Sequence, residues 1–391
     1  MKHFLHQMPS KYLILLPFLV FTASLNAQQF NEVGIITEDV PSTNQGSQMI
    51  NKILVGSNSD NIYVAGRFDG ANIDFDIKTG TANVQQMNSN NSGTNNDAFL
   101  TKYKANGKYI RKMQLAPNTG TNNAEIMSMA MDASENIYII GYIAVGNIDF
   151  DPSTNTTSLT SAGGQDIVIA KYDSTFAFQW AFQIGSATAG SFEHGNDIAV
   201  DASGMIYITG SFDGTADFDP STNTSNLASN GGGDIFVAKY DGTVTSPAGP
   251  TNTAFYKWAF KVGGTSSTQG RDMANAIALD ASSNVYVCGK FMGAVDFDPG
   301  TAANTLTSDF DGTNNSDAFA AKYSSAGAHV WAFKLGDVSS TSTLRHDEAF
   351  GITVDANTNV YVVGTFYGTT IDFNPATGTA NVANLTATTS P

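Results

Sequence analysis

Acidic residues in a short repeated pattern are the residues of this sequence that could most readily do chemistry. The triplet Asp-Phe-Asp recurs at four equivalent places along the chain, and the fifth such place reads Asp-Phe-Asn. In an extended strand, residues two positions apart lie on one face, so both carboxylates point away from the Phe. Paired oxygen ligands of this kind suit Ca²⁺. The pattern predicts a possible calcium site, with the candidate ligands Asp149, Asp151, Asp217, Asp219, Asp296 and Asp298.

A structural role for the same triplets is the alternative interpretation. The Phe would anchor a hairpin in the core while the acids face water, and recurrence in every copy favours this role. No Asp-x-Asp-x-Asp-Gly loop is present to strengthen the metal hypothesis. The Asp-Phe-Asp motif therefore leaves both uses open.

Other residue types offer no shared catalytic mechanism, so we assign no catalytic residue. The histidines after residue 27 are His194, His329 and His346, and none has the spacing of a metal site or a catalytic triad, so we expect surface or turn positions. Cys288, the single cysteine, takes the place of Ala65, Ile140, Thr209 and Val363 in the other copies of strand b, which predicts a buried free thiol. Arg111 and Arg271 break the repeated pattern without other unusual residues beside them in sequence.

A tandem repeat positions all of these residues. One segment of the type Asn-Ile-Tyr-Val-x-Gly-x-Phe recurs five times, and its tyrosines are spaced by 75, 69, 79 and 75 residues. A short apolar segment ending in Asp precedes it in copies two to five, and the acidic triplet follows it in all five copies. Copies one to four continue with a segment of the Asp-Ile-Phe-Val-Ala-Lys-Tyr type, and copies two to four then have a segment of the Trp-Ala-Phe-Lys-x-Gly type. The anchors of the five copies are Tyr63, Tyr138, Tyr207, Tyr286 and Tyr361.

The repeat predicts four short strands per copy, which we name a, b, c and d in chain order. Strand b is apolar on both faces, which indicates a sheet packed between two neighbours. Radially stacked four-stranded blades meet that condition, so we predict an all-β fold, a β-propeller of about five blades whose last blade is incomplete. A β-solenoid would need much shorter repeats, and separate sandwiches would need about seven strands each. The tryptophans before Ala-Phe could stack on carbohydrate, but their periodic place favours packing between blades.

A second set of acids precedes strand a: Glu193, Asp272 and Asp347, eight residues upstream of the Asp that ends the strand, with Glu125 offset by one. If strand a lines the central channel, these acids surround one mouth of it and could bind a cation or a basic ligand. The alternative is a solvated loop in which the acids cap turns.

These segments, in the order in which they follow one another along the chain, resemble the SBBP-type β-propeller repeat of exported bacterial proteins. The resemblance extends from about Gln48 to Asn374, and the start of the chain is similar to signals of Bacteroidetes-type secreted proteins. The resemblance implies the propeller fold and a surface or extracellular location. It implies no particular activity, because such repeats occur in proteins of diverse role.

The termini predict export. Residues 1–27 combine Lys2 and Lys11 with the apolar run 12–21 and end in Leu-Asn-Ala, the pattern of a signal peptide. The run is too short to span a bilayer. Cleavage would leave 17 basic and 35 acidic residues, a net charge of −18. So acidic a chain is repelled by nucleic acid and anionic membranes.

The repeats would occupy residues 28–374, and residues 375–391 form a polar tail. Residues 30–36 could be an isolated strand d, and the fifth copy lacks strands c and d, so we expect a piece of a longer propeller. Residues 241–253 lengthen one c–d loop, a usual place for recognition.

The function predicted is an exported, non-enzymatic scaffold or binding module at the cell surface, outside the cell or in the periplasm. Its loops would contact a protein or a glycan. The alternatives are a hydrolase or lyase with acids at the channel mouth, and a spacer for another domain.

Overall fold

Every regular element of the structure is a β-strand, as the sequence predicts. The structure is a computed structural model that describes residues 37–38, 47–57, 59–76, 85–90, 95–117, 123–144, 146–188, 190–245, 255–264, 270–308, 315–336, 346–367, 370–372 and 384–386. None of these ranges contains a helix, and therefore none contains a helix able to cross a membrane. The predicted signal peptide and the expected strand at 30–36 lie outside the described residues.

The contacts divide the chain into two compact units after Ile126, and each is described by itself. The first unit holds one complete copy of the repeat as an antiparallel sheet in the order a-b-c-d. Its strands are β2 (Gln48–Val55), β3 (Asn61–Phe68), β6 (Asp97–Lys104) and β7 (Tyr109–Leu115). A second, three-stranded sheet consists of β1 (Thr37–Glu38), β4 (Ile73–Asp74) and β5 (Gln86–Met87).

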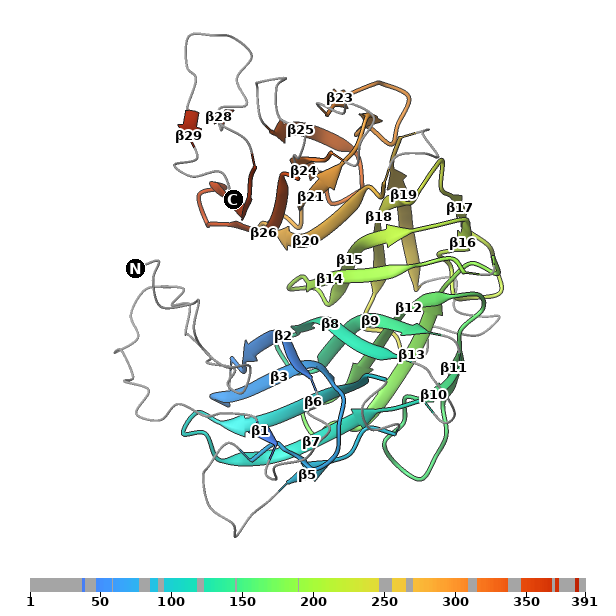
Figure 1. Cartoon of the computed structure of the whole chain (residues 1–391), viewed down its shortest axis with the longest axis vertical. Helices are drawn as coiled ribbons and strands as arrows, with labels where there is room; N and C mark the ends of the chain where they lie inside the picture. Colours follow the sequence, from blue (N-terminus) through green and yellow to red (C-terminus); the bar gives the residue numbers. More distant parts are fainter. Residues whose placement is uncertain are drawn as a thin grey trace. The chain divides into compact units, whose positions relative to one another are not determined.

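Three further four-stranded sheets of the same order and one two-stranded sheet follow, one per copy of the motif; all belong to the second unit except the first three residues of β8 (Figure 1). The second repeat has β8 (Ala124–Met131), β9 (Ile137–Ala144), β12 (Gln165–Tyr172) and β13 (Phe178–Ile184). The third has β14 (His194–Val200), β15 (Met205–Phe212), β18 (Asp234–Asp241) and β19 (Tyr256–Val262). The fourth has β20 (Met273–Leu279), β21 (Val285–Phe291), β24 (Asp317–Tyr323) and β25 (His329–Leu335). The fifth has β26 (Glu348–Val354) and β27 (Val360–Thr365).

Short outer hairpins follow strand b, where the structural interpretation of the triplet expected a hairpin; the count of four strands per copy did not include their strands. Each has a strand of two or three residues ending at the first Asp of the triplet, too short to show a period of two. In the second unit they are β10 (Asn147–Asp149) with β11 (Ser158–Thr160), β16 (Thr215–Asp217) with β17 (Asn226–Ala228), β22 (Ala294–Asp296) with β23 (Thr305–Thr307), and β28 (Thr370–Asp372) with β29 (Asn384–Thr386). Part of the expected polar tail is thus a strand paired with β28.

The sheets stack face to face, and this explains why strand b is apolar on both sides. Within the second unit, β14 packs on β9, β20 packs on β14 and β15, and β26 packs on β20 and β21. Tyr207 of one sheet shares a core cluster with Val285 and Phe319 of the next. The repeated four-stranded antiparallel sheets with successive inner strands in contact are the blades of a β-propeller.

An asparagine at a β-bulge links consecutive inner strands. The register of strand a shifts around Asn196 in β14 and around Asn275 in β20. The bulge turns each side chain toward the next blade. Their amide groups donate to the carbonyl oxygens of Ala274 and Ala349, 2.9 Å away in both cases. The same contact joins Asn51 to the carbonyl of Ile126 in the first unit, also at 2.9 Å.

Candidate functional site

The Asp-Phe-Asp triplets close the loops of the outer hairpins. One carboxylate oxygen of Asp217 accepts backbone N–H bonds from Asp219 and Ser225, at 3.0 and 2.8 Å. The second acid, Asp219, accepts the N–H of Ser221 at 3.0 Å, and the intervening Phe218 is fully buried. Equivalent bonds are made by Asp149, Asp151, Asp296 and Asp298. The structure therefore shows these acids in the loop-closing role, while calcium binding stays a prediction.

The acids predicted at a channel mouth are buried at the junctions between blades. Asp272, 4% exposed, accepts the N–H of Gly264 at 2.9 Å and that of Met292 at 2.8 Å. Gly264 follows the last strand of the third blade and Met292 follows strand b of the fourth, so one carboxylate connects two blades. Burial raises the pKa of Asp272 to about 7, against the opposing effect of these two amides.

Asp347 and Glu193 have the corresponding places at the next and the previous junction. Asp347 is fully buried and accepts the N–H of Tyr367 at 2.8 Å. Glu193 is also fully buried and receives weak bonds from the N–H of Ser186 at 3.4 Å and the hydroxyl of Ser191 at 3.3 Å. Its other carboxylate oxygen has no hydrogen-bond partner among the described residues. Burial raises the pKa of Glu193 to about 7.

The backbone of the same acids is also bonded across the junction. The N–H groups of Glu193, Asp272 and Asp347 donate to the carbonyl that precedes or begins strand c of the previous blade, at 2.9, 3.1 and 2.9 Å. Each of the three acids thus connects two neighbouring blades by hydrogen bonds, and we call Glu193, Asp272 and Asp347 the acid clasps. They lie at three separate junctions and do not come together as one site. Within the ranges that the structure describes, no three His, Cys, Asp or Glu residues gather so that they could hold a metal ion.

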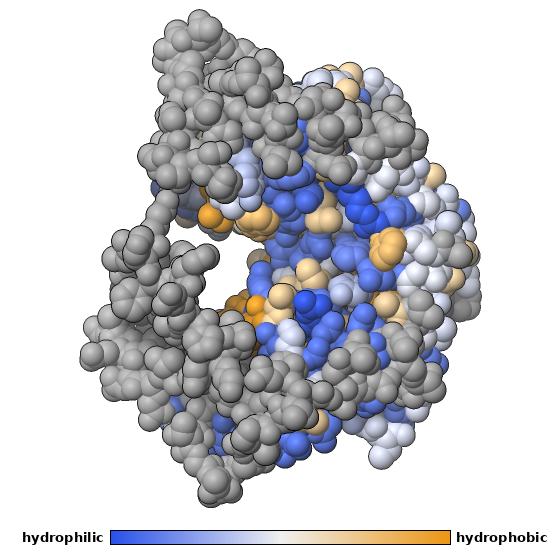
Figure 2. Space-filling view, in the orientation of Figure 1, coloured by the Kyte–Doolittle hydropathy of each residue, from blue (hydrophilic) through white to orange (hydrophobic). Residues whose placement is uncertain are grey.

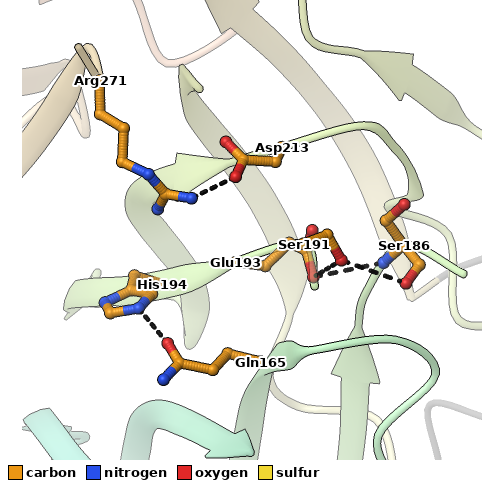
Figure 3. Close-up of polar contacts among 7 residues, drawn as sticks. All are labelled: Gln165, Ser186, Ser191, Glu193, His194, Asp213 and Arg271. Carbon is orange, nitrogen blue, oxygen red and sulfur yellow. Dashed lines mark hydrogen bonds and ion pairs between the residues drawn. The ribbon is translucent and has the colours of Figure 1, made fainter. Parts of the chain in front are cut away.

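Side chains that differ between copies gather beside the Glu193 clasp (Figure 3). Phe192, Arg271 and His346 occupy one position of the repeat, immediately before the three acids. The guanidinium of Arg271 pairs with the carboxylate of Asp213 and lies over the ring of Phe192, 5.3 Å from its centroid. Phe192 is 46% exposed, a large fraction for a Phe. We call Phe192, Asp213 and Arg271 the Phe192–Arg271 surface.

His194 lies two residues after Phe192 on β14 and contacts the second blade. Its imidazole stacks on the ring of Tyr142, with centroids 4.8 Å apart, and its Nε2 hydrogen-bonds the side-chain oxygen of Gln165. Burial lowers the pKa of His194 to about 4, and the nearby charge of Arg271 lowers it further. The imidazole is therefore neutral at neutral pH. The expectation of a surface or turn position was wrong for His194, because the apolar ring of Tyr142 covers it.

Gly233 makes room for the Arg271–Asp213 pair. It has φ of +122°, and a Cβ there would lie 2.7 Å from the Asp213 carboxylate and 3.0 Å from Cγ of Arg271. The sequence shows Arg271 as a one-off residue but gives no sign of its partners, since Asp213 and Phe192 are 58 and 79 positions away. Arg111, the other one-off arginine, is an exposed residue of β7 in the first unit.

Two further predictions concern packing, those for the tryptophans and for Cys288, and the structure confirms both. Trp180 is 3% exposed, and its indole N–H donates to the carbonyl of Val244 in the next blade at 3.1 Å. Trp258 bonds Ser325 of the following blade in the same way at 3.4 Å. Cys288 is a buried free thiol, and burial raises its pKa to about 12. On the face seen in Figure 2, hydrophilic residues cover much of the coloured surface, with hydrophobic residues scattered among them.

Comparison with known proteins places the repeat beside a WD-repeat protein. The chain is 31% identical over 185 residues to the uncharacterized WD repeat-containing protein L264 of Acanthamoeba polyphaga mimivirus. The match covers 45% of this chain and 12% of that protein, so the chain corresponds to about an eighth of the relative's length. No family model matches the chain. The similarity agrees with the propeller architecture seen in the sheets.

Proposed function

We propose that this protein is an exported, non-enzymatic β-propeller binding module and that the Phe192–Arg271 surface contacts its ligand. The observation that carries the proposal is the contrast between two classes of repeat position. Several positions that hold the blades together, such as the anchor tyrosine of strand b and the acid before strand a, keep their residue type in most copies. The position before the acid clasp changes from Phe to Arg to His, and two of these side chains meet on a partly exposed surface. Loop positions free of a packing role are where scaffolds place recognition.

The alternative hypothesis, a hydrolase or lyase, would use Glu193, Asp272 and Asp347 as catalytic acids, but their geometry supports a structural role. A general acid or base must reach the substrate. Both carboxylate oxygens of Asp272 already accept backbone N–H bonds, and Glu193 and Asp347 are fully buried. Raised pKa values are common in catalytic acids, but burial at a blade junction accounts for those of Glu193 and Asp272 without a reaction. The contacts therefore support binding.

The Phe192–Arg271 surface suits a ligand rich in hydroxyl groups, such as a glycan. The exposed Phe ring offers an apolar face for a sugar ring to stack on. Beside it, the guanidinium of Arg271 offers several N–H donors, and the carboxylate of Asp213 offers acceptors. A sugar presents a hydroxyl both as donor and as acceptor, so it can use both charged groups without carrying a charge. The net charge of −16 also disfavours acidic ligands.

Export and a bacterial cell-surface or extracellular location are part of the same proposal. They are supported by the pattern of residues 1–27, by the resemblance to SBBP-type repeats and by a chain with one cysteine, which is buried and free. Expression of the full chain in a bacterial host tests this part. Recovery from the periplasm or medium of a protein that begins at Gln28 is the expected result. Retention of the whole chain in the cytoplasm would contradict it.

A glycan array probed with the native protein and its variants tests the binding site. Phe192→Ser and Arg271→Ala should each weaken a glycan hit by about tenfold or more, since each removes one of the two main contacts. Phe350→Ser is a matched control, because Phe350 is 52% exposed on β26 and lies outside this surface. Thermal unfolding of each variant establishes that the fold is kept. Glycan hits that all three variants bind equally would place recognition elsewhere, and hits only on a parallel peptide array would replace the glycan by a protein ligand.

A further inference from the structure

The fifth repeat has a strand b whose outer edge is open. Among the residues that the structure describes, β27 pairs only with β26. In the other four copies strand c covers that edge, and the anchor tyrosines are at most 1% exposed. The corresponding Tyr361 is 56% exposed and Val363 is 67% exposed, whereas Cys288 at the position of Val363 in the fourth blade is fully buried. An open edge with apolar side chains is a template for another strand.

Strand c of the complete blades shows which residue this edge would receive opposite Tyr361. In each of them a lysine of strand c lies over the anchor tyrosine, with its Nζ 4.7 to 5.1 Å from the ring centroid. In the fourth blade this lysine, Lys322, also pairs with Asp280 at 3.6 Å.

The fifth repeat has the tyrosine and the aspartate that contact the strand c lysine in the fourth blade. The hydroxyl of Tyr361 donates to Asp355 at 3.2 Å, as that of Tyr286 does to Asp280 at 3.1 Å. No lysine or arginine of the described residues lies over the Tyr361 ring or pairs with Asp355. The edge therefore has a negative charge and an aromatic face at the point where strand c carries its lysine.

The fourth blade shows a second contact that a neighbour would complete. Trp180 and Trp258 each donate an indole N–H to a carbonyl in the c–d loop of the next blade. Lys239 donates to the same loop carbonyl as Trp258, that of Ser325, at 3.2 Å. Trp331 is the equivalent residue of the fourth blade, and in the described part of the chain its indole N–H has no acceptor. A c–d loop beside the fifth blade would supply one.

We propose that the open edge of β27 binds a partner β-hairpin built on the c–d pattern of this repeat. The first strand of the hairpin pairs with β27 and places its lysine over Tyr361 and next to Asp355. The hairpin turn offers a carbonyl to Trp331. Two separate features, the Tyr361–Asp355 pair and the indole of Trp331, thus define the partner by charge, register and turn position.

A synthetic hairpin with the sequence of residues 317–335 tests the proposal against the full chain. Binding is followed by the anisotropy of a label on the peptide, and hydrogen exchange locates the contact. We expect one peptide per chain and slower exchange of the amides of Val360–Thr365. Replacing the lysine of the peptide that corresponds to Lys322 by Glu should weaken binding about tenfold, since it turns an attraction to the ring and to Asp355 into a repulsion.

Variants of the protein supply the matched controls. Asp355→Asn keeps an oxygen to cap the turn and removes the charge, so it should reduce the preference for the lysine peptide over the glutamate peptide. Trp331→Phe keeps an aromatic ring and loses the N–H, which should weaken both peptides equally. Equal binding of both peptides by the native chain, or protection elsewhere, would overturn the proposal. So would a dimer of the protein alone that protects β27 and excludes the peptide, because a second copy would then be the occupant.

Discussion

The imidazole of His194 stacks on the ring of Tyr142 with an angle of 21° between the two planes. The same two positions of the repeat hold Lys290 and Glu348, which form an ion pair of 3.1 Å. In the first unit they hold Arg67 and Glu125, 3.5 Å apart. One contact position is thus filled by an ion pair twice and by stacked rings once. At these three junctions a contact is made between the two positions, and its chemistry differs from one junction to another.

The first prediction is that the stacked rings of Tyr142 and His194 can be replaced by an ion pair. His194→Glu alone should destabilise the fold by about 1–2 kcal/mol, because it places a carboxylate against an aromatic ring and beside the buried Glu193. Adding Tyr142→Lys should restore part of the loss by recreating the Lys290–Glu348 pair. Urea unfolding of both single variants and the double variant measures the coupling. Strictly additive effects would show that the two positions do not form an equivalent contact.

The clasp residue Asp272 predicts a loss of stability with rising pH. Its pKa of about 7 in the folded chain lies above its ordinary value of 3.8, so between these two values the folded state binds more protons than the unfolded state. The free energy of unfolding should therefore fall as pH rises from about 4 to about 7 and then level off. Asp272→Asn should make the pH profile flatter, which denaturant titrations between pH 4 and pH 8 can measure. An identical slope in both proteins would contradict the assignment.

His194 predicts the opposite trend over a different range. Its pKa of about 4 lies below the ordinary 6.5, so the unfolded chain takes up the proton first as the pH falls. Stability contributed by the neutral ring should be lost between about pH 6.5 and pH 4. His194→Phe keeps an aromatic ring against Tyr142 and cannot titrate, so the difference between the two pH profiles isolates the contribution of the imidazole. A difference that does not vary with pH would count against the buried neutral state.

Packing between blades predicts a large effect of Trp180. Trp180→Ala should cost about 3–5 kcal/mol, since the ring is buried against Phe255 of the next blade and its N–H is bonded there. Trp258→Ala should cost less, because Trp258 is only partly buried. Trp258→Phe should cost the least of the three. Chemical denaturation gives the three values, and a Trp180→Ala variant as stable as the native protein would contradict the core position.

The Asp-Phe-Asp loops can be tested for their two predicted uses together. Asp217→Ala removes the acceptor of two backbone N–H groups and should destabilise the fold by about 1 kcal/mol, whereas Asp217→Asn should keep most of the stability. If Ca²⁺ also binds, as the sequence predicts, it should raise the unfolding temperature of the native protein, and less so in Asp217→Asn. A calorimetric titration without heat of binding and an unchanged unfolding temperature would leave only the loop-closing use.

The sequence predicted the strands well because each carries its own local signal. Strand b is apolar on both faces, and the structure places it between two blades, as with Tyr207 and Ile208, which are both fully buried. Strand a was predicted too short, because its first half contains polar residues such as Asn196, whose side chain is used across the junction. The outer hairpins were expected as a place where the Phe is anchored, but their short strands were left out of the count of four per copy. Three residues are too few to reveal an alternation.

The candidate site shows the limit of sequence reasoning. The acids before strand a were identified correctly as a repeated feature, but whether they face solvent depends on what packs over them. Glu193 and Asp272 are buried because the next blade closes on them, and burial sets their pKa values. Likewise His194 was expected at the surface because its partners, Tyr142 and Gln165, belong to a different blade.

The sequence by itself determined the repeat, the strand order and the all-β class, because these depend on periodicity and local propensity within about 75 residues. Only the tertiary structure decided which polar side chains are clasps and which form a surface. Arg271 meets Asp213 and Phe192 because successive blades stack, and Tyr361 is exposed because no described strand lies beside β27 and no described blade packs on the face that carries Tyr361. Burial and contact between distant residues arise from packing, and packing is a property of the blades together.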